Sequence, residues 1–374
     1  MIWIMEDSKK TGWGGGQRIT LEAMRALGKR DIRLFDSTDL VLEKIRPQIP
    51  AVQFTPIVSG GKSVKGVSSF SFPLSEIFLY ALHFSVNIVR IAKMARADKP
   101  DIVYCAHKKP LLPVLLLKRL GLLKARVIFH VHLIVPPRFI HRAFHALARA
   151  TADVLICVSR RVFDQWEGGR RELVYNPIPP EVLIQKSPWT PGQPLRVGFV
   201  GSTTYLKGFD LFLEIAKKLG GSDRKPGYDF RVFTRTPVPE QDVPVTYFQE
   251  STGADIYRNM DVLLICSRAE ESFSLTALEA AANHIPVVFP GQAALLEILT
   301  PEISGEMYQQ SRVQDMVAAL ETLARRLEED PRACQPQSEE LLRRYSLEVF
   351  RDRMREIFSG SDYPHASPDK GQTP

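Results

Sequence analysis

Two glutamates that lie eight residues apart, Glu271 and Glu279, have the types and spacing to do chemistry. The apolar run 261–266 before them has the length of a strand buried on both faces, and helix formers follow, so the stretch is interpreted as strand, loop and helix. The first N–H groups of a helix have no partner within it, which favours an anion such as a phosphate at that end. Eight residues span about two helical turns, so we expect Glu279 inside the helix and Glu271 in the loop before it, each reaching a different part of an extended ligand.

Hydroxyl side chains in the same stretch, Ser272, Ser274 and Thr276, are candidate caps for this helix, and Pro286 is expected to end it. Glutamate is mostly exposed in proteins, so the pair taken alone is equally well explained as two solvated surface residues. Other parts of the chain have to decide between these interpretations.

A glycine-rich turn near the N-terminus, residues 11–18, follows a predicted strand over residues 2–5 and precedes a predicted helix over 19–27. Strand, glycine turn and helix is an arrangement that brings backbone amides close to a phosphate. Three glycines alone are also compatible with a plain flexible connection.

The second half of the chain repeats this arrangement. A strand over 195–201 leads to a loop that places Lys207 before Gly208, and a helix over 209–219 follows. An ammonium at this position can pair with a diphosphate. A surface lysine is the plainer interpretation, but a cation at a helix N-terminus is electrostatically unfavourable for structure alone.

A strand predicted over residues 126–133 places His130 and His132 on one face, because side chains alternate along a strand. A lone histidine near a strand end is more often a hydrogen-bonded structural residue than a catalyst. The strand alone therefore leaves both roles open.

Strands alternate with helices through most of the 374 residues, which predicts an α/β chain with two doubly wound, mostly parallel sheets. Six prolines between residues 177 and 194 mark a linker. We expect an N-terminal Rossmann-like domain over residues 1–178, a linker over 179–194 and a second Rossmann-like domain over 195–340. A helix over 341–358 is expected to pack back on the N-terminal domain, followed by a disordered tail over 359–374.

Composition and cysteine usage indicate a globular protein of the cytoplasm. Hydrophobic residues make up 44% of the chain and charged residues 24%, and no uninterrupted apolar run reaches the length of a membrane span. The N-terminus lacks the basic start and cleavage site of a secretion signal. The four cysteines are widely spaced, so we expect reduced, buried thiols and no metal cluster.

Positive charge is concentrated in the first half of the chain. Residues 62–172 contain 19 Lys and Arg against 7 Asp and Glu, which is +12 and leaves −5 for the rest of the total of +7. A basic half suggests contact with an anionic surface. We favour membrane headgroups over nucleic acid, because no zinc-finger spacing or RNA-binding signature accompanies the charge.

These features together resemble the retaining GT-B glycosyltransferases of the glycosyl transferases group 1 (family 4) type. The family signature has two glutamates separated by seven residues, with an apolar pair and a Leu-Glu-Ala triplet, and ends in Pro-Val-Val. In this chain it reads Glu271, Ser272, Phe273, Ser274, Leu275, then Leu278, Glu279, Ala280, then Pro286, Val287, Val288. The resemblance extends from Gly14 to about Ile357 and implies the GT-B fold, in which two Rossmann-like domains face each other across a cleft.

The resemblance also implies roles for the matched residues. Glu279 would hold the ribose of a nucleotide sugar, Glu271 would contact the sugar, and Lys207 would neutralise the diphosphate. The amides of Phe273, Ser274 and Leu275, beside Ser272, would bind the diphosphate, and Gly15 and Gly16 would lie near the donor phosphates. His132 would face the donor sugar. Asn176 matches the asparagine that the family has before the linker.

The chain departs from the family pattern at three places. Ser202 stands where the family has an arginine, His284 stands where it has a glycine, and the strand over 230–234 lacks the usual glycines. The sequence leaves open whether Arg235, Arg18 or no residue replaces the arginine at Ser202.

The implied activity is transfer of a sugar from a UDP- or GDP-linked donor to a hydroxyl of a glycan or lipid-linked acceptor in cell-envelope polysaccharide synthesis. Glu271, His132 and Lys207 would be the catalytic residues, without metal or cofactor, and the enzyme would work at the inner face of the membrane. A nucleotide-sugar epimerase of the same fold and a non-catalytic nucleotide-sugar-binding protein are the alternatives.

Overall fold

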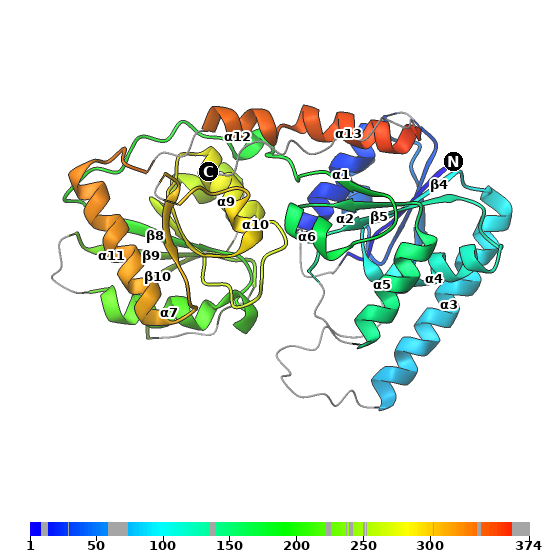
Figure 1. Cartoon of the computed structure of the whole chain (residues 1–374), viewed down its shortest axis with the longest axis horizontal. Helices are drawn as coiled ribbons and strands as arrows, with labels where there is room; N and C mark the ends of the chain where they lie inside the picture. The colour runs from blue at the N-terminus through cyan, green and yellow to red at the C-terminus, as the bar shows by residue number, and fades with distance from the viewer. Residues whose placement is uncertain are drawn as a thin grey trace.

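The computed structural model describes residues 1–8, 14–28, 30–58, 74–134, 139–221, 226–236, 238, 242–249, 251, 253–301, 303–334 and 338–360. Two lobes lie side by side, each built on a parallel sheet covered by helices (Figure 1). The predicted pair of doubly wound α/β domains is therefore confirmed.

The N-terminal sheet has seven parallel strands in the order β3-β2-β1-β4-β5-β6-β7. The chain runs outward from β1 to β3 and then crosses to β4 on the other side of β1, so the strand order reverses between β1 and β4. In such sheets ligands bind at this reversal, outside the carboxyl ends of the strands. The strands are β1 (Ile2–Met5), β2 (Ile32–Asp36), β3 (Gln53–Pro56), β4 (Ile102–Cys105), β5 (Arg126–Val131), β6 (Val154–Cys157) and β7 (Arg171–Leu173).

Helices cover both faces of this sheet because its strands are apolar on both sides. Trp3 and Met5 of β1 pack toward α3, α4 and α5, while Ile2 and Ile4 pack toward α1 and α2. The helices of this domain are α1 (Gly15–Leu27), α2 (Leu40–Ile45), α3 (Leu74–Asp98), α4 (Lys108–Arg119), α5 (Phe139–Thr151) and α6 (Arg160–Gln165).

The C-terminal sheet has six parallel strands in the order β10-β9-β8-β11-β12-β13, which reverses between β8 and β11. Lys207 follows β8 and Glu271 follows β11, so the topology brings these two side chains to one place. The strands are β8 (Leu195–Val200), β9 (Tyr228–Phe233), β10 (Val245–Phe248), β11 (Val262–Leu264), β12 (Val287–Pro290) and β13 (Gly305–Tyr308). The helices are α7 (Phe209–Leu219), α8 (Ala254–Arg258), α9 (Leu275–Ala282), α10 (Ala293–Leu296), α11 (Val313–Glu329), α12 (Ser338–Arg344) and α13 (Leu347–Ser359), with short 3-10 turns at Pro180–Val182 and Tyr205–Lys207.

The end of the chain returns to the first domain. Helices α12 and α13 run along one side of both lobes, and α13 lies beside α1 (Figure 1). Phe350, Met354 and Ile357 of α13 are buried in the same apolar cluster as α1. On its polar side, Arg351 pairs with Glu22 of α1 at 2.6 Å.

Several local expectations were wrong in detail. The first helix begins at Gly15, so the predicted glycine turn supplies its first turn. The helix expected over 341–358 is two helices, because the Ser346 side chain accepts the N–H of Val349 at 3.1 Å and caps the start of α13. None of the predicted serine and threonine caps forms a side-chain capping bond at α9, whose N-cap position is Ser274.

Two expectations fall partly outside the described residues: residues 11–13 of the glycine turn and the tail from 361 onward. The four cysteines are buried thiols that form no disulfide, as predicted. Within the described ranges, no helix has both the length and the apolar character needed to cross a membrane.

Candidate functional site

A cavity of about 390 Å³, here called the interdomain cavity, lies between the two lobes at the carboxyl ends of β4, β5 and β8. Both strand-order reversals open onto it, and so do the N-termini of α1, α4 and α9. Of the residues predicted for the site, it is lined by Gly15, Gly16, His132, Lys207, Glu271, Ser272, Phe273, Ser274 and Leu275. Other lining residues include Ala106, His107, Lys108, His130, Trp166, Asn176 and Gly201.

Lys207 and Glu271, which the resemblance assigned to different parts of a donor, form an ion pair in this structure. Lys207 Nζ lies 2.7 Å from Glu271 Oε1, and Ser267 Oγ donates to the same oxygen at 2.6 Å. The amide of Glu271 donates to Gln292 Oε1 at 2.8 Å, which holds the loop against α10. The pair places a cation and a carboxylate together on the C-terminal wall of the cavity.

The N-terminus of α9 faces the cavity without a side-chain cap. Ser274, the N-cap residue, has a φ of 70° in the left-handed region, which is uncommon for a residue other than glycine. Such strained backbone is often found at ligand sites. The amides of the first turn and the helix dipole therefore remain available for an anion.

The two domains touch directly at the cavity. Ser272 Oγ donates to the backbone oxygen of His132 at 2.6 Å, joining the loop before α9 to the end of β5. A Cβ added to Gly15 would lie 2.7 Å from Leu275 Cδ1, so the end of that leucine side chain would have to move to make room for it. A Cβ on Gly16 would come no nearer than 3.9 Å to His107.

Glu279 lies behind the cavity wall and does not line it. Its side chain is only 7% exposed, and its two oxygens are engaged by Arg18 of α1 and by the Tyr257 hydroxyl, which donates at 2.6 Å. A buried carboxylate needs such partners to offset its desolvation. The structure thus places Glu279 in an ion pair across the domain interface.

Ser202, where the family arginine is missing, is exposed and also lies outside the cavity lining. Its hydroxyl lies 3.4 Å from Thr204 Oγ1. Of the two arginines considered as replacements, Arg18 is committed to Glu279, and neither Arg18 nor Arg235 lines the cavity in the described part of the chain.

His132 is held neutral by its surroundings. Its ring lies 4.0 Å from that of His130, and burial together with the nearby charge of His107 lowers its pKa to about 3. Burial likewise holds the pKa of His130 well below its usual range. Neutral imidazoles can hydrogen-bond to sugar hydroxyls, because each ring has one donor and one acceptor.

His107 and Glu6, which the sequence analysis did not single out, form an ion pair at the reversal between β1 and β4. His107 Nε2 lies 2.5 Å from Glu6 Oε1, and Thr20 Oγ1 donates to Glu6 Oε2 at 2.5 Å. Burial lowers the pKa of His107, but the hydrogen bond and charge of Glu6 outweigh burial and raise it overall. Glu6 directly follows β1 and His107 lies two residues after β4, and this position at the strand ends was the signal that could have identified them.

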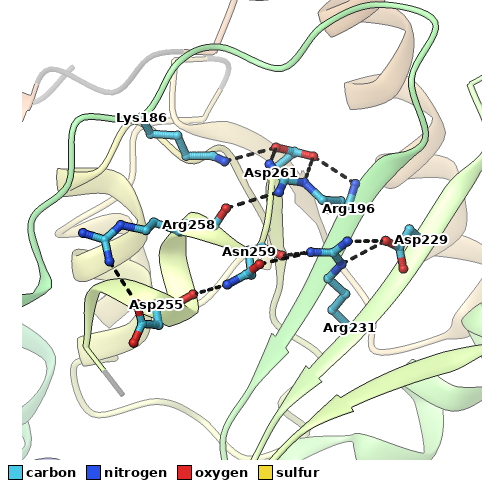
Figure 2. A network of polar contacts seen from close by, with 8 residues as sticks. All are labelled: Lys186, Arg196, Asp229, Arg231, Asp255, Arg258, Asn259 and Asp261. Carbon is cyan, nitrogen blue, oxygen red and sulfur yellow. Dashed lines mark hydrogen bonds and ion pairs between the residues drawn. The ribbon is translucent and has the colours of Figure 1, made fainter. Parts of the chain in front are cut away.

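A larger cavity of about 550 Å³ lies between the linker and the opposite ends of the strands of the second sheet. Figure 2 shows the charged side chains around it. Lys186 of the linker lies 3.2 Å from Asp261, which also accepts two bonds from the Arg196 guanidinium, and Arg231 pairs with Asp229. Both carboxylates are engaged in these ion pairs, and the network attaches the linker to the second domain. We therefore place the functional site at the interdomain cavity.

Metal binding has no evident place in the described part of the chain. No group of three or more His, Cys, Asp and Glu side chains there has an arrangement that could hold a metal ion.

Comparison with protein families gives two matches that follow one another along the chain. Residues 13–182 match the model of Glycosyltransferase Family 4, and residues 194–326 match that of Glycosyl transferases group 1. A D-inositol 3-phosphate glycosyltransferase of Rhodococcus erythropolis is 31% identical over 150 residues. That match covers 38% of this chain and 30% of the relative's length.

Solved structures with the same fold cover 96% of this chain. An Anabaena protein, Alr3699/HepE, in complex with UDP and glucose is similar with a TM-score of 0.73 at 14% identity, over its full length. A sucrose-phosphate synthase from Thermosynechococcus elongatus is similar with a TM-score of 0.70 at 16% identity, also over its full length. At these identities the likeness concerns the fold, which is that of GT-B glycosyltransferases.

Proposed function

Because the chain belongs to the glycosyltransferases by the family models that match both of its domains, we propose that it transfers a sugar from a nucleotide-diphosphate sugar to a hydroxyl acceptor, with retention of the anomeric configuration. The donor would be UDP- or GDP-linked, and the acceptor a glycan or lipid-linked glycan of the cell envelope. The observation that carries this proposal is the interdomain cavity, where Lys207, Glu271 and the N-terminus of α9 face Gly16 and His132. The similar Anabaena protein has been solved with UDP and glucose, which supports a nucleotide-sugar donor.

The donor diphosphate would lie at the N-terminus of α9. Its charge would draw Lys207 away from Glu271, because two phosphate groups attract an ammonium more strongly than one carboxylate does. Lys207 and the helix amides would then stabilise the negative charge that develops on the departing nucleoside diphosphate. Glu271, released from the pair, would accept a hydrogen bond from a sugar hydroxyl.

His132 and the walls of the cavity would orient the sugar. A neutral imidazole on the N-terminal wall can bond to a hydroxyl of the donor sugar without competing for the diphosphate. The cavity lies between two domains, so their closure would exclude water and bring the acceptor hydroxyl to the anomeric carbon.

Glu279 would bind the ribose hydroxyls only after exchanging or sharing its present partners. In this structure Arg18 and Tyr257 occupy its oxygens. Donor binding would therefore alter the ion pair that crosses the domain interface, which links occupancy of the site to the arrangement of the domains.

Contact with an anionic membrane is a further part of the proposal. Helix α3 exposes an apolar stripe of Leu82, Val86 and Val89, spaced four and three residues apart on one side of the helix. The stripe belongs to the basic first half of the chain, so apolar and electrostatic attraction would act together.

The donor site is tested by Lys207→Met and Glu271→Gln, with Lys218→Met, an exposed lysine of α7, as the control. Loss of a charge-assisted bond to the diphosphate should weaken UDP or GDP binding by about 10- to 100-fold in Lys207→Met, measured by calorimetry. Glu271→Gln should keep nucleotide affinity and lower hydrolysis of the matching nucleotide sugar by at least about tenfold.

The melting temperature of both variants should stay close to that of the unaltered protein, because both side chains reach solvent. Full nucleotide affinity and full turnover in both variants would rule out this assignment of the donor site. The ¹H NMR signal of the anomeric proton in the transfer product would decide whether configuration is retained.

A further inference from the structure

Three consecutive basic residues stand at the N-terminus of α4, which is the unfavourable end of a helix for cations. His107 is the N-cap residue, and Lys108 and Lys109 begin the helix, whose first turn contains no acidic residue. The arrangement is costly unless negative charge compensates it.

Two of these residues are compensated by carboxylates that follow β1. His107 pairs with the fully buried Glu6 at 2.5 Å, and Lys109 lies 3.3 Å from Asp7. Lys108 forms no ion pair with any described residue, although its side chain is partly buried and lines the interdomain cavity. Lys108 is therefore the one of these three cations that no described carboxylate pairs with, and its side chain lines the cavity beside the N-terminus of the helix.

A fully buried imidazole with an unpartnered ring nitrogen lines the same cavity. His130 is 0% exposed, and its Nδ1 lies 2.5 Å from the Tyr104 hydroxyl. The direction of this hydrogen bond depends on which ring nitrogen of His130 carries the proton. Nε2 has no hydrogen-bond partner among the described residues, and in the tautomer in which the Tyr104 hydroxyl donates to Nδ1 it presents an unpaired N–H.

We propose that the acceptor carries a phosphate group and that His107, Lys108, His130 and the N-terminus of α4 bind it on the N-terminal wall of the cavity. This rests on the proposed function, in which the donor diphosphate occupies the opposite wall with Lys207 and α9. A phosphate offers acceptors in several directions, so an ammonium, an imidazole N–H and helix amides at one cavity can bind it together.

The experiment uses the full chain saturated with UDP, to which inorganic phosphate is added in a calorimetric titration. Glucose 6-phosphate against glucose, and vesicles containing phosphatidic acid against neutral vesicles, distinguish a soluble phosphorylated acceptor from a lipid phosphate. The UDP-loaded protein should bind phosphate and at least one phosphorylated probe, and should not bind glucose measurably at the same concentration.

Lys108→Met tests the residue, and Lys109→Met is the matched control one position further along the helix. Methionine keeps the apolar stem of a partly buried lysine, so the fold should be retained, and the melting temperature checks this. Lys108→Met should weaken phosphate binding by at least about tenfold, as expected for one charge-assisted bond, while Lys109→Met changes it by less than about threefold. UDP affinity should be the same in both variants.

Three results would overturn the proposal: no phosphate binding to the UDP-loaded protein, equal phosphate affinity in Lys108→Met, or a loss of UDP affinity in Lys108→Met. The last would assign Lys108 to the donor. Failure of the unaltered protein to bind any nucleotide would instead refute the proposed function. Phosphate binding that depends on Lys108 would still be measurable in that case, so the two failures are distinguishable.

Discussion

At the scale of single residues, histidines in the same cavity have different pKa values because their surroundings differ. His107 is held charged by the buried Glu6, whereas burial keeps His130 and His132 neutral. A charged imidazole attracts anions, and a neutral one hydrogen-bonds to hydroxyls. The same residue type can therefore serve a phosphate and a sugar within one cavity.

Asp36, at the end of β2, is a buried carboxylate whose pKa makes the stability of the fold depend on pH. Its Oδ1 accepts the amides of Ser8 and Ser37, each at 2.7 Å. Burial raises its pKa from 3.8 to about 6 despite these bonds. Ionisation of Asp36 thus favours the unfolded chain, and its cost to the fold grows as pH rises from 3.8 through 6 and is complete above that range.

We expect Asp36→Asn to raise the free energy of unfolding by about 3 kcal/mol at pH 7.5, because the amide keeps Oδ1 and carries no charge. Near pH 4 the carboxyl is mostly protonated in the fold, so the gain should shrink to less than about 1 kcal/mol. Urea unfolding of both proteins at the two pH values measures the difference. A gain that is equal at both values, or larger in acid, would contradict the raised pKa.

At the scale of elements, short loops after the strands position the site, and glycines permit their geometry. Gly208 is the N-cap residue of α7, and it follows Lys207 directly. It has a φ of +68°, and a Cβ there would lie 2.0 Å from the backbone oxygen of Cys266, just after β11. The loop that carries Lys207 can pass so close to the end of β11 only because this residue has no side chain.

Gly208→Ala is expected to destabilise the protein by at least about 3 kcal/mol, since a backbone clash adds to the left-handed strain. Gly221→Ala is the matched control, because Gly221 has a φ of +70° and open space around it in the described structure. That change should cost only the strain, about 1 to 2 kcal/mol. Similar losses in the two variants, measured by urea unfolding, would show that the contact with Cys266 does not limit the loop.

At the scale of the whole molecule, several contacts hold the two domains together. Glu297 accepts the amides of Arg160 and Arg161 at the start of α6, and the Arg161 guanidinium pairs with Glu270. One apolar cluster runs from Trp166 in the first domain to Phe273 in the second. Together with α13, which packs on the first domain, these contacts hold the two domains so that both of them line the cavity.

The basic first half and the stripe on α3 predict reversible membrane binding of the entire molecule. Leu82, Val86 and Val89 are 48%, 39% and 67% exposed. Replacing all three by Gln should lower co-sedimentation with anionic vesicles at low salt by at least about tenfold, because burial of such side chains contributes about 1 kcal/mol each. The fold should be unaffected, since the positions are solvent-facing.

Val349→Gln on α13, where the valine is 47% exposed, is the control and should bind vesicles like the unaltered protein. Added salt should weaken binding of both, because the headgroup attraction is screened. An unaltered protein that stays in the supernatant at low salt would exclude the membrane contact.

The sequence by itself determined the features that depend on neighbours along the chain. Alternating apolar runs and helix formers predicted two doubly wound sheets, and the strand, loop and helix units placed Lys207 and Glu271 at strand ends. The same local logic predicted that Glu279 lies within a helix, which α9 confirms. Each of these conclusions needs only periodicity, turn chemistry and strand topology.

Only the tertiary structure decided which distant groups meet. Arg18 and Glu279 are separated by 261 residues, and Glu6 and His107 come from strands that become neighbours only because the strand order reverses between β1 and β4. Such partners decide whether a carboxylate already has a hydrogen-bonded cation and whether a histidine is charged, because burial and nearby charges shift the pKa of both groups. The sequence therefore located the site, while the charge states and pairings within it were set by long-range packing that no local pattern contains.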